Sequence, residues 1–121
     1  MKPVFTYSAL VTRVIDGDTI DATIDLGFSV FVRERFRLYG IDTPEKSSTD
    51  ITVKESAYKA TNFVREQIEG KAVIIECTGK DKYGRWLGKI HLSGVVSSIN
   101  DQLVLLGFAK VYFGTDKTKL I

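Results

Sequence analysis

The sequence predicts an all-β fold, a five-stranded barrel with two helices, which other conventions class as α+β. Strand-like segments, in which apolar and polar residues alternate, form one early group and one later group. A helical pattern separates the two groups, and a second segment with helix-capping residues follows the later one.

Length and composition indicate one globular domain over residues 1–121. Hydrophobic residues make up 44% and charged residues 26% of the chain, and the net charge of +2 does not oppose a nucleic-acid partner. A chain of this length buries about two thirds of its unfolded surface. No apolar run reaches membrane-spanning length, and Met1–Tyr7 lacks the apolar core of a signal peptide. We expect a soluble monomer, cytoplasmic as it stands or secreted if a leader has been removed.

The first two strands form a predicted hairpin. Tyr7–Ile15 is rich in strand-forming residues and breaks at Asp16-Gly17-Asp18, a turn signal. From Thr19 the pattern alternates, which is typical of a half-buried strand whose apolar face carries Ile20, Ala22, Ile24 and Leu26.

A third strand is predicted from Phe28 to Leu38, after a turn at Leu26-Gly27. Because side chains alternate along a strand, Arg33, Arg35 and Arg37 fall on one face. For Arg33 and Arg35, an ordinary solvated face is the favoured interpretation.

The segment Ile41–Glu45 is expected to leave the sheet as a loop. Pro44 cannot donate to a sheet ladder, and it biases Thr43 toward an extended backbone. The carboxylates of Asp42 and Glu45 are then available for chemistry.

A helix is predicted next, because Thr52 and Glu55 have capping-box spacing and Gly70 provides a stop. Its apolar residues recur at steps of three and four, at Val53, Ala57, Ala60, Val64 and Ile68.

Two more strands, Ala72–Cys77 and Trp86–Leu92, are followed by a second short helix near the C-terminus, Ser98–Leu106. Ser98 is the expected cap of that helix and Gly107 its terminator. This order of elements matches the OB-fold barrel, in which a helix follows the third strand.

Three separated segments carry the residues suited to chemistry: Asp16–Thr19, Arg37–Glu45 and Lys82–Arg85. Acidic oxygens suit a hard cation such as Ca²⁺ or Mg²⁺, and paired arginines suit a phosphate. The single Cys77 and the single His91 cannot supply a Cys/His zinc site.

These segments closely resemble the staphylococcal nuclease (thermonuclease) family. The resemblance spans roughly Val11 to Val111 and follows the order of the family's motifs. It is carried by Val14-Ile15-Asp16-Gly17-Asp18-Thr19, Phe36-Arg37-Leu38, Ile41-Asp42-Thr43-Pro44-Glu45, Asp81-Lys82-Tyr83-Gly84-Arg85 and Gly107-Phe108-Ala109-Lys110-Val111.

The resemblance implies a calcium-dependent nuclease that hydrolyses phosphodiester bonds of DNA and RNA and leaves 3′-phosphate ends. Asp18 and Asp42 match the calcium-binding carboxylates, and Thr43 matches the residue that offers its backbone carbonyl. Arg37 and Arg85 match the two phosphate-binding arginines.

The remaining positions complete the implied site. Glu45 matches the proposed general base. Tyr83 and Tyr112 match or lie near positions that contact phosphate and base, although core packing is an equal alternative for Tyr112. Lys82 either attracts phosphate or is simply solvated.

Two departures from the family and two alternative functions remain. The family's enzyme continues into a further helix where this chain ends at Ile121, and the loop after Glu45 is short. These departures affect the expected stability and substrate preference. The alternatives are a non-catalytic nucleic-acid-binding module and a protein-interaction OB domain.

Overall fold

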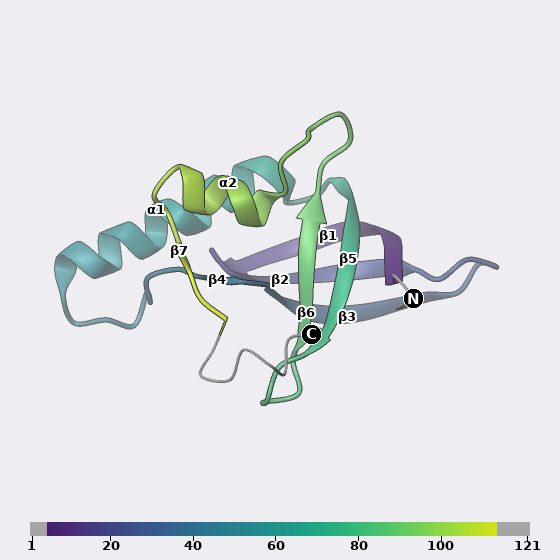
Figure 1. The fold of residues 1–121 in the computed structure, drawn as a ribbon, viewed down its shortest axis with the longest axis horizontal. Helices are drawn as coiled ribbons and strands as arrows, with labels where there is room; N and C mark the ends of the chain where they lie inside the picture. Colours follow the sequence, from purple (N-terminus) through teal and green to yellow (C-terminus); the bar gives the residue numbers. More distant parts are fainter. Residues whose placement is uncertain (1–4, 114–121) are drawn as a thin grey trace.

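The computed structural model describes residues 5–113, which form a closed barrel with two helices packed at one end (Figure 1). Residues 1–4 and 114–121, which include most of the N-terminal stretch and the chain end considered above, lie outside the described residues. The elements are β1 (Phe5–Asp16), β2 (Thr19–Asp25), β3 (Phe31–Leu38), β4 (Ile41–Asp42), α1 (Ile51–Ile68), β5 (Ala72–Lys80), β6 (Trp86–His91), α2 (Ile99–Leu105) and β7 (Lys110–Val111).

The barrel has the strand order β1-β2-β3-β6-β5 and closes through pairing of β1 with β5. All neighbours are antiparallel except β3 and β6, where Phe36–Leu38 runs parallel to Trp86–Gly88. The predicted five-stranded OB-type barrel with two helices is therefore confirmed.

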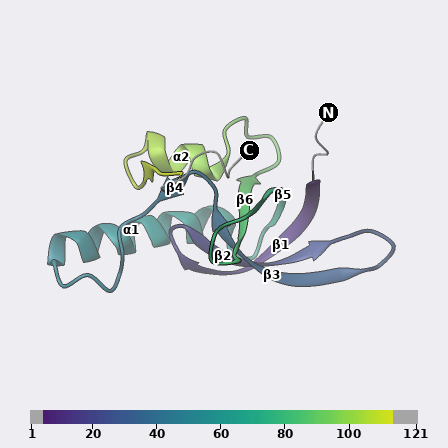
Figure 2. The same cartoon turned by 60° about the horizontal axis from the view of Figure 1, so that its bottom comes forward.

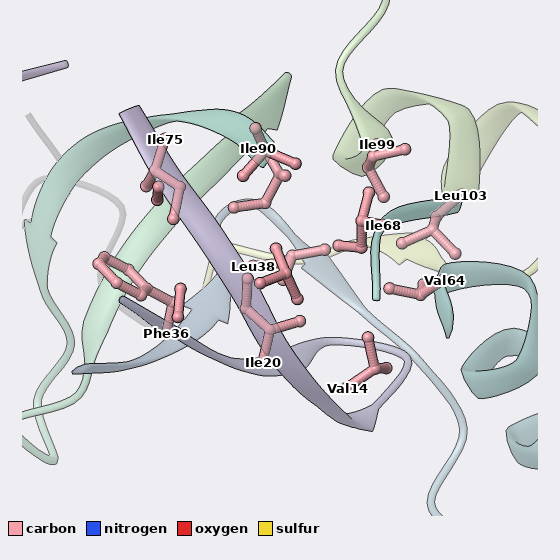
Figure 3. Close-up of a cluster of buried hydrophobic side chains, with 14 of the residues drawn as sticks. Val14, Ile20, Phe36, Leu38, Val64, Ile68, Ile75, Ile90, Ile99 and Leu103 are labelled. Atoms are coloured by element: carbon pink, nitrogen blue, oxygen red, sulfur yellow. The ribbon is translucent and has the colours of Figure 1, made fainter. Parts of the chain in front are cut away.

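Apolar side chains from every strand of the barrel fill its interior. Figure 3 shows Ile20, Phe36, Ile75 and Ile90 inside it, and all are at most 4% exposed. The helices add buried side chains at one end of this core, namely Val64, Ile68, Ile99 and Leu103. Burial of this kind stabilises the fold by about 25 cal/mol per Å² of apolar surface.

The helix α1 begins two residues earlier than its sequence pattern suggests. Asp50 is its N-cap, and Asp50 Oδ1 accepts hydrogen bonds from the backbone amides of Thr52 and Val53. The predicted capping role of Thr52 is wrong, because Asp50 offers a carboxylate two residues earlier and so satisfies the first free amides. Gly70, at φ +76°, follows the end of the helix as expected. Within residues 5–113, no helix has the length and apolarity needed to cross a membrane.

The predicted start of the third strand at Phe28 is also wrong. Hydrogen bonds from Leu26 N to Val30 O and from Val30 N to Gly27 O close a tight turn that contains Phe28 at φ +55°. The phenyl ring of Phe28 is fully exposed, and β3 begins only at Phe31. The resulting β2–β3 hairpin projects from the barrel on the side away from α1, as Figures 1 and 2 show.

The expected loop at Ile41–Glu45 is a loop only in part. Ile41 and Asp42 form the short strand β4, which pairs with Val111 and Lys110 of β7. Two residues are too few to show a periodic pattern in the sequence. The pairing forms because the segment after α2 lies beside β4 in the folded chain. The helix α2 itself is confirmed, with Ser98 Oγ accepting a hydrogen bond from Asp101 N.

Candidate active site

The β2–β3 ladder brings Asp18 beside Arg37. Thr19 is the partner of Arg37 in this ladder, and Leu38 N donates a hydrogen bond of 2.7 Å to Asp18 O. Gly17, which precedes Asp18, is packed against α1, because a Cβ there would lie 2.9 Å from Ala60 Cβ. The turn between β1 and β2 is therefore fixed by close packing, and Asp18 is only 7% exposed.

One guanidinium joins the acidic residues of two segments. Arg37 Nη1 donates to Asp18 Oδ2 at 3.2 Å, and Arg37 Nη2 donates to Asp42 Oδ1 at 2.9 Å and to Ile41 O at 3.3 Å. The backbone amide of Thr43 donates to Asp18 Oδ2 at 3.3 Å. We call Asp18, Arg37, Asp42 and Thr43 the Arg37 cluster.

The Arg37 cluster is partly buried, which strengthens its charge interactions. The side chains of Arg37, Asp18 and Asp42 are 16%, 9% and 38% exposed. Burial alone would lower the pKa of Arg37, but the charges of Asp18, Asp42 and Asp81 and the hydrogen bond to Asp42 outweigh it and raise that pKa. Arg37 is therefore held as a fixed cation, with its donors already aligned.

Glu45 lies outside this network, on the exposed segment between β4 and α1. Its backbone carbonyl accepts a hydrogen bond of 3.2 Å from Ser48 N. Among residues 5–113, its carboxylate makes no hydrogen bond or ion pair. The carboxylate can therefore accept a proton from a water molecule without first breaking a contact to the described residues.

The third predicted segment is organised by Asp81, the residue directly before it, which belongs to the family-like motif but had no predicted role. Asp81 Oδ1 accepts hydrogen bonds from the amides of Tyr83 and Arg85, and Asp81 Oδ2 lies 2.7 Å from Arg85 Nε. Burial would raise the pKa of Asp81, but these hydrogen bonds and the charge of Arg85 lower it. The only sequence signal for this role is the spacing of Asp81 and Arg85 across a turn.

The structure thus brings the first two segments into direct contact. The third segment interacts with them through the charge of Asp81, which acts on Arg37. Asp81 helps to raise the pKa of Arg37, whereas Arg85 makes its side-chain hydrogen bond to Asp81. Among the described residues, Arg85 makes no hydrogen bond to the Arg37 cluster.

Exposed aromatic rings and cations lie on the neighbouring loops. Tyr83 is 72% exposed, with Lys82 Nζ and Arg85 Cζ at 5.3 and 5.4 Å from its ring centre. Tyr112 donates its amide to Gly40 O at 2.9 Å and is 45% exposed, so its ring is not part of the core. These side chains are available to stack on bases or attract phosphate.

The oxygen atoms of the Arg37 cluster are chemically suited to bind a hard cation. They are the carboxylates of Asp18 and Asp42 and the backbone carbonyl of Thr43, all of which are oxygen ligands of the kind that Ca²⁺ and Mg²⁺ prefer. Within the described part of the chain, no group of three or more His, Cys, Asp or Glu side chains is placed to hold a metal ion. Two carboxylates with a backbone carbonyl remain compatible with calcium, which accepts such mixed ligands.

Comparison with known proteins identifies the family. A family model described as "Staphylococcal nuclease homologue" matches residues 35–120. The chain is 35% identical to a thermonuclease of Staphylococcus intermedius, over 94% of this chain and 66% of that protein. It is also 33% identical to an uncharacterised protein of Methanocaldococcus jannaschii, over 93% of this chain and 63% of that protein.

Endonuclease YhcR of Bacillus subtilis is 30% identical over 88% of this chain, which corresponds to only 9% of that protein. The chain therefore spans about two thirds or less of the length of these relatives. The matched residues 35–120 include Arg37, Asp42, Thr43, Glu45 and Arg85. The chain belongs to the family of staphylococcal nuclease homologues.

Proposed function

We propose that this chain is a calcium-dependent nuclease that hydrolyses DNA and RNA and leaves 3′-phosphate ends. The observation that carries the proposal is the placement of Arg37 between two carboxylates, at 3.2 Å from Asp18 and 2.9 Å from Asp42. An aligned cation beside oxygen ligands for a metal ion is what a phosphodiester requires, because charge on its non-bridging oxygens must be neutralised. Membership of the family supports the same activity.

Asp18, Asp42 and the Thr43 carbonyl would hold the calcium ion. When bound, calcium neutralises charge on the phosphate and favours attack at phosphorus. Arg37 would turn its two Nη donors from the carboxylates to phosphate oxygens, as the planar guanidinium allows. Arg37 would then stabilise the charge that develops during the reaction.

Glu45 and Arg85 would take the remaining roles. The exposed Glu45 carboxylate would accept the proton of the attacking water, whose oxygen forms the new bond to phosphorus. Breaking the bond from phosphorus to the 5′ oxygen, which takes up a proton from solvent water, then leaves a 3′-phosphate and a 5′-hydroxyl. Arg85 would exchange its contact with Asp81 for the phosphate, and Lys82, Tyr83 and Tyr112 would bind the flanking nucleotide.

The test is cleavage of end-labelled single-stranded DNA and RNA by the purified chain, with calcium or with EDTA. We expect cleavage of both substrates with calcium, none with EDTA, and products whose mobility changes after removal of a 3′-phosphate. Calcium-stimulated binding without cleavage would instead identify a non-catalytic nucleic-acid module. Neither binding nor cleavage would favour a protein-interaction domain.

We further propose that residues 1–121 act as a single monomeric domain. The closed barrel and its two helices share one core, which supports this proposal. Equilibrium sedimentation at the concentration of the cleavage assay tests it, and a dimer mass would contradict it.

A further inference from the structure

Lys46, the residue directly after Glu45, connects the active-site loop to two other elements. Its Nζ donates a hydrogen bond of 2.6 Å to Ile15 O and lies 3.2 Å from Asp16 Oδ1. The same Nζ lies 5.6 Å from the centre of the Tyr58 ring on α1, within the range of a cation–π contact. The Lys46 side chain is only 27% exposed, so it is not a freely solvated lysine.

Two contacts to the region of the β1–β2 turn bracket Glu45. Two residues before it, Thr43 N donates to Asp18 Oδ2 at 3.3 Å, and one residue after it, Lys46 binds Ile15 and Asp16. The first anchor, Asp18, lies on the β1–β2 turn, and the second lies at the end of β1, directly before that turn. The backbone of Glu45 is thereby held on both sides relative to Asp18.

The side chain of Glu45 contributes nothing to its own placement among residues 5–113, because its carboxylate makes no hydrogen bond or ion pair there. Beyond Lys46, the bonds that secure the loop within residues 5–113 are short-range, from Ser48 N to Glu45 O and from Asp50 N to Ser48 Oγ. Long-range restraint on the C-terminal side of Glu45 therefore comes from Lys46.

We propose that Lys46 is a positioning residue that holds the backbone of Glu45, and so its carboxylate, in place relative to the Arg37 cluster. This inference rests on the proposed role of Glu45 as general base. Misplacement of a catalytic group by about 1 Å can cost up to about 10²-fold in rate. Loss of the Lys46 contacts would slow the chemical step without removing a calcium ligand or a phosphate-binding group.

The test compares Lys46→Met, which keeps an unbranched stem without the ammonium group, with Lys46→Arg, which keeps a positive charge and hydrogen-bond donors. Lys54→Met is the matched control, because Lys54 is an exposed lysine on α1. For each variant, kcat and KM on single-stranded DNA are measured with saturating calcium. Hydrogen exchange of the Ser48 amide reports the order of the loop independently of activity.

We expect Lys46→Met to lower kcat about tenfold at an unchanged KM and to accelerate exchange at Ser48 severalfold. Lys46→Arg should recover most of both properties, and Lys54→Met should match the wild type. Wild-type cleavage with equal kcat in Lys46→Met and Lys54→Met would overturn the positioning role alone. Absence of cleavage by the wild type would overturn the proposed function and this role with it. Unchanged exchange at Ser48 in Lys46→Met would also overturn the role, whatever the activity.

Discussion

Arg37 Nη2 lies 2.9 Å from Asp42 Oδ1, so the guanidinium is hydrogen-bonded to a carboxylate that we propose as a calcium ligand. The same arginine binds Asp18 at 3.2 Å. Arg37 and a calcium ion would therefore share the oxygens of Asp18 and Asp42. The arginine keeps both carboxylates paired, and it would lie beside a calcium ion bound to them once these contacts were exchanged.

Asp42→Asn should weaken calcium binding at least tenfold, which corresponds to about 1.4 kcal/mol. The amide keeps the size of the carboxylate but loses the charge that attracts a hard cation. Because Asp42 is 38% exposed at its side chain, the barrel should remain folded. Calorimetric titration measures the affinity, with Asp21→Asn as control, since Asp21 instead binds Arg35 at 2.8 Å. Equal affinities for Asp42→Asn and the wild type would remove Asp42 from the metal site.

Glu45→Gln should lower single-turnover cleavage about 10² to 10⁴-fold, the range for a lost acid–base group. The amide keeps the shape of the side chain and cannot accept the proton. Binding of a nucleotide bisphosphate with calcium should change little, because Glu45 lies outside the Arg37 cluster. Glu55→Gln, an exposed position on α1, is the control. A fully active Glu45→Gln protein would require a different base.

Asn100→Leu should lower the free energy of unfolding by about 2–4 kcal/mol, because it leaves buried backbone groups without their hydrogen-bond partner. The Asn100 side chain is 2% exposed. It donates to Tyr39 O at 2.9 Å and to Gly88 O at 3.0 Å, and it accepts from Ile90 N at 3.1 Å. Urea unfolding measures the change, and Gln102→Leu on the same helix should cost much less. Similar losses in the two variants would mean that these bonds do not secure α2 to the barrel.

Stability should depend on Asp81 at acid pH. The hydrogen bonds from Arg85 and Tyr83 lower the pKa of Asp81 below its usual 3.8 in the folded state. Between those two pKa values the unfolded chain binds more protons, so stability is fully present above about pH 4 and is lost as the pH falls through the folded value. The difference in unfolding free energy between the wild type and Asp81→Asn should therefore shrink from pH 6 to pH 2.5. A constant difference across that range would contradict this account.

The sequence was sufficient to predict the elements that depend on local patterns. The barrel strands follow alternation, and Ser98 and Gly107 bound α2 as expected. Phe28 was misplaced because the apolar alternation continues through a turn that backbone hydrogen bonds define. The predicted capping role of Thr52 is wrong because Asp50, two residues earlier, caps the first free amides of the helix.

Contacts between distant segments were harder to predict. Asp18 and Arg37 could be paired in advance only through the family resemblance, whereas the register of β2 with β3 places them physically. The pairing of Asp42 with Lys110 and the contact of Lys46 with Ile15 join segments whose separation no local pattern encodes. The hydrogen bond between Asp81 and Arg85 is local, but the sequence of this charged turn does not show which of its charged side chains pair.

The most direct test of the Arg37 cluster as the catalytic centre is single-turnover cleavage of DNA by Arg37→Ala and Arg35→Ala. The two arginines lie on the same strand, but Arg35 binds the half-buried Asp21, whereas Arg37 bridges Asp18 and Asp42. With the fold confirmed by circular dichroism, Arg37→Ala should lose about 10² to 10³-fold, as expected for a preorganised donor, and Arg35→Ala should stay within about twofold of the wild type. Near-normal cleavage by Arg37→Ala, or equal losses in both variants, would contradict the assignment.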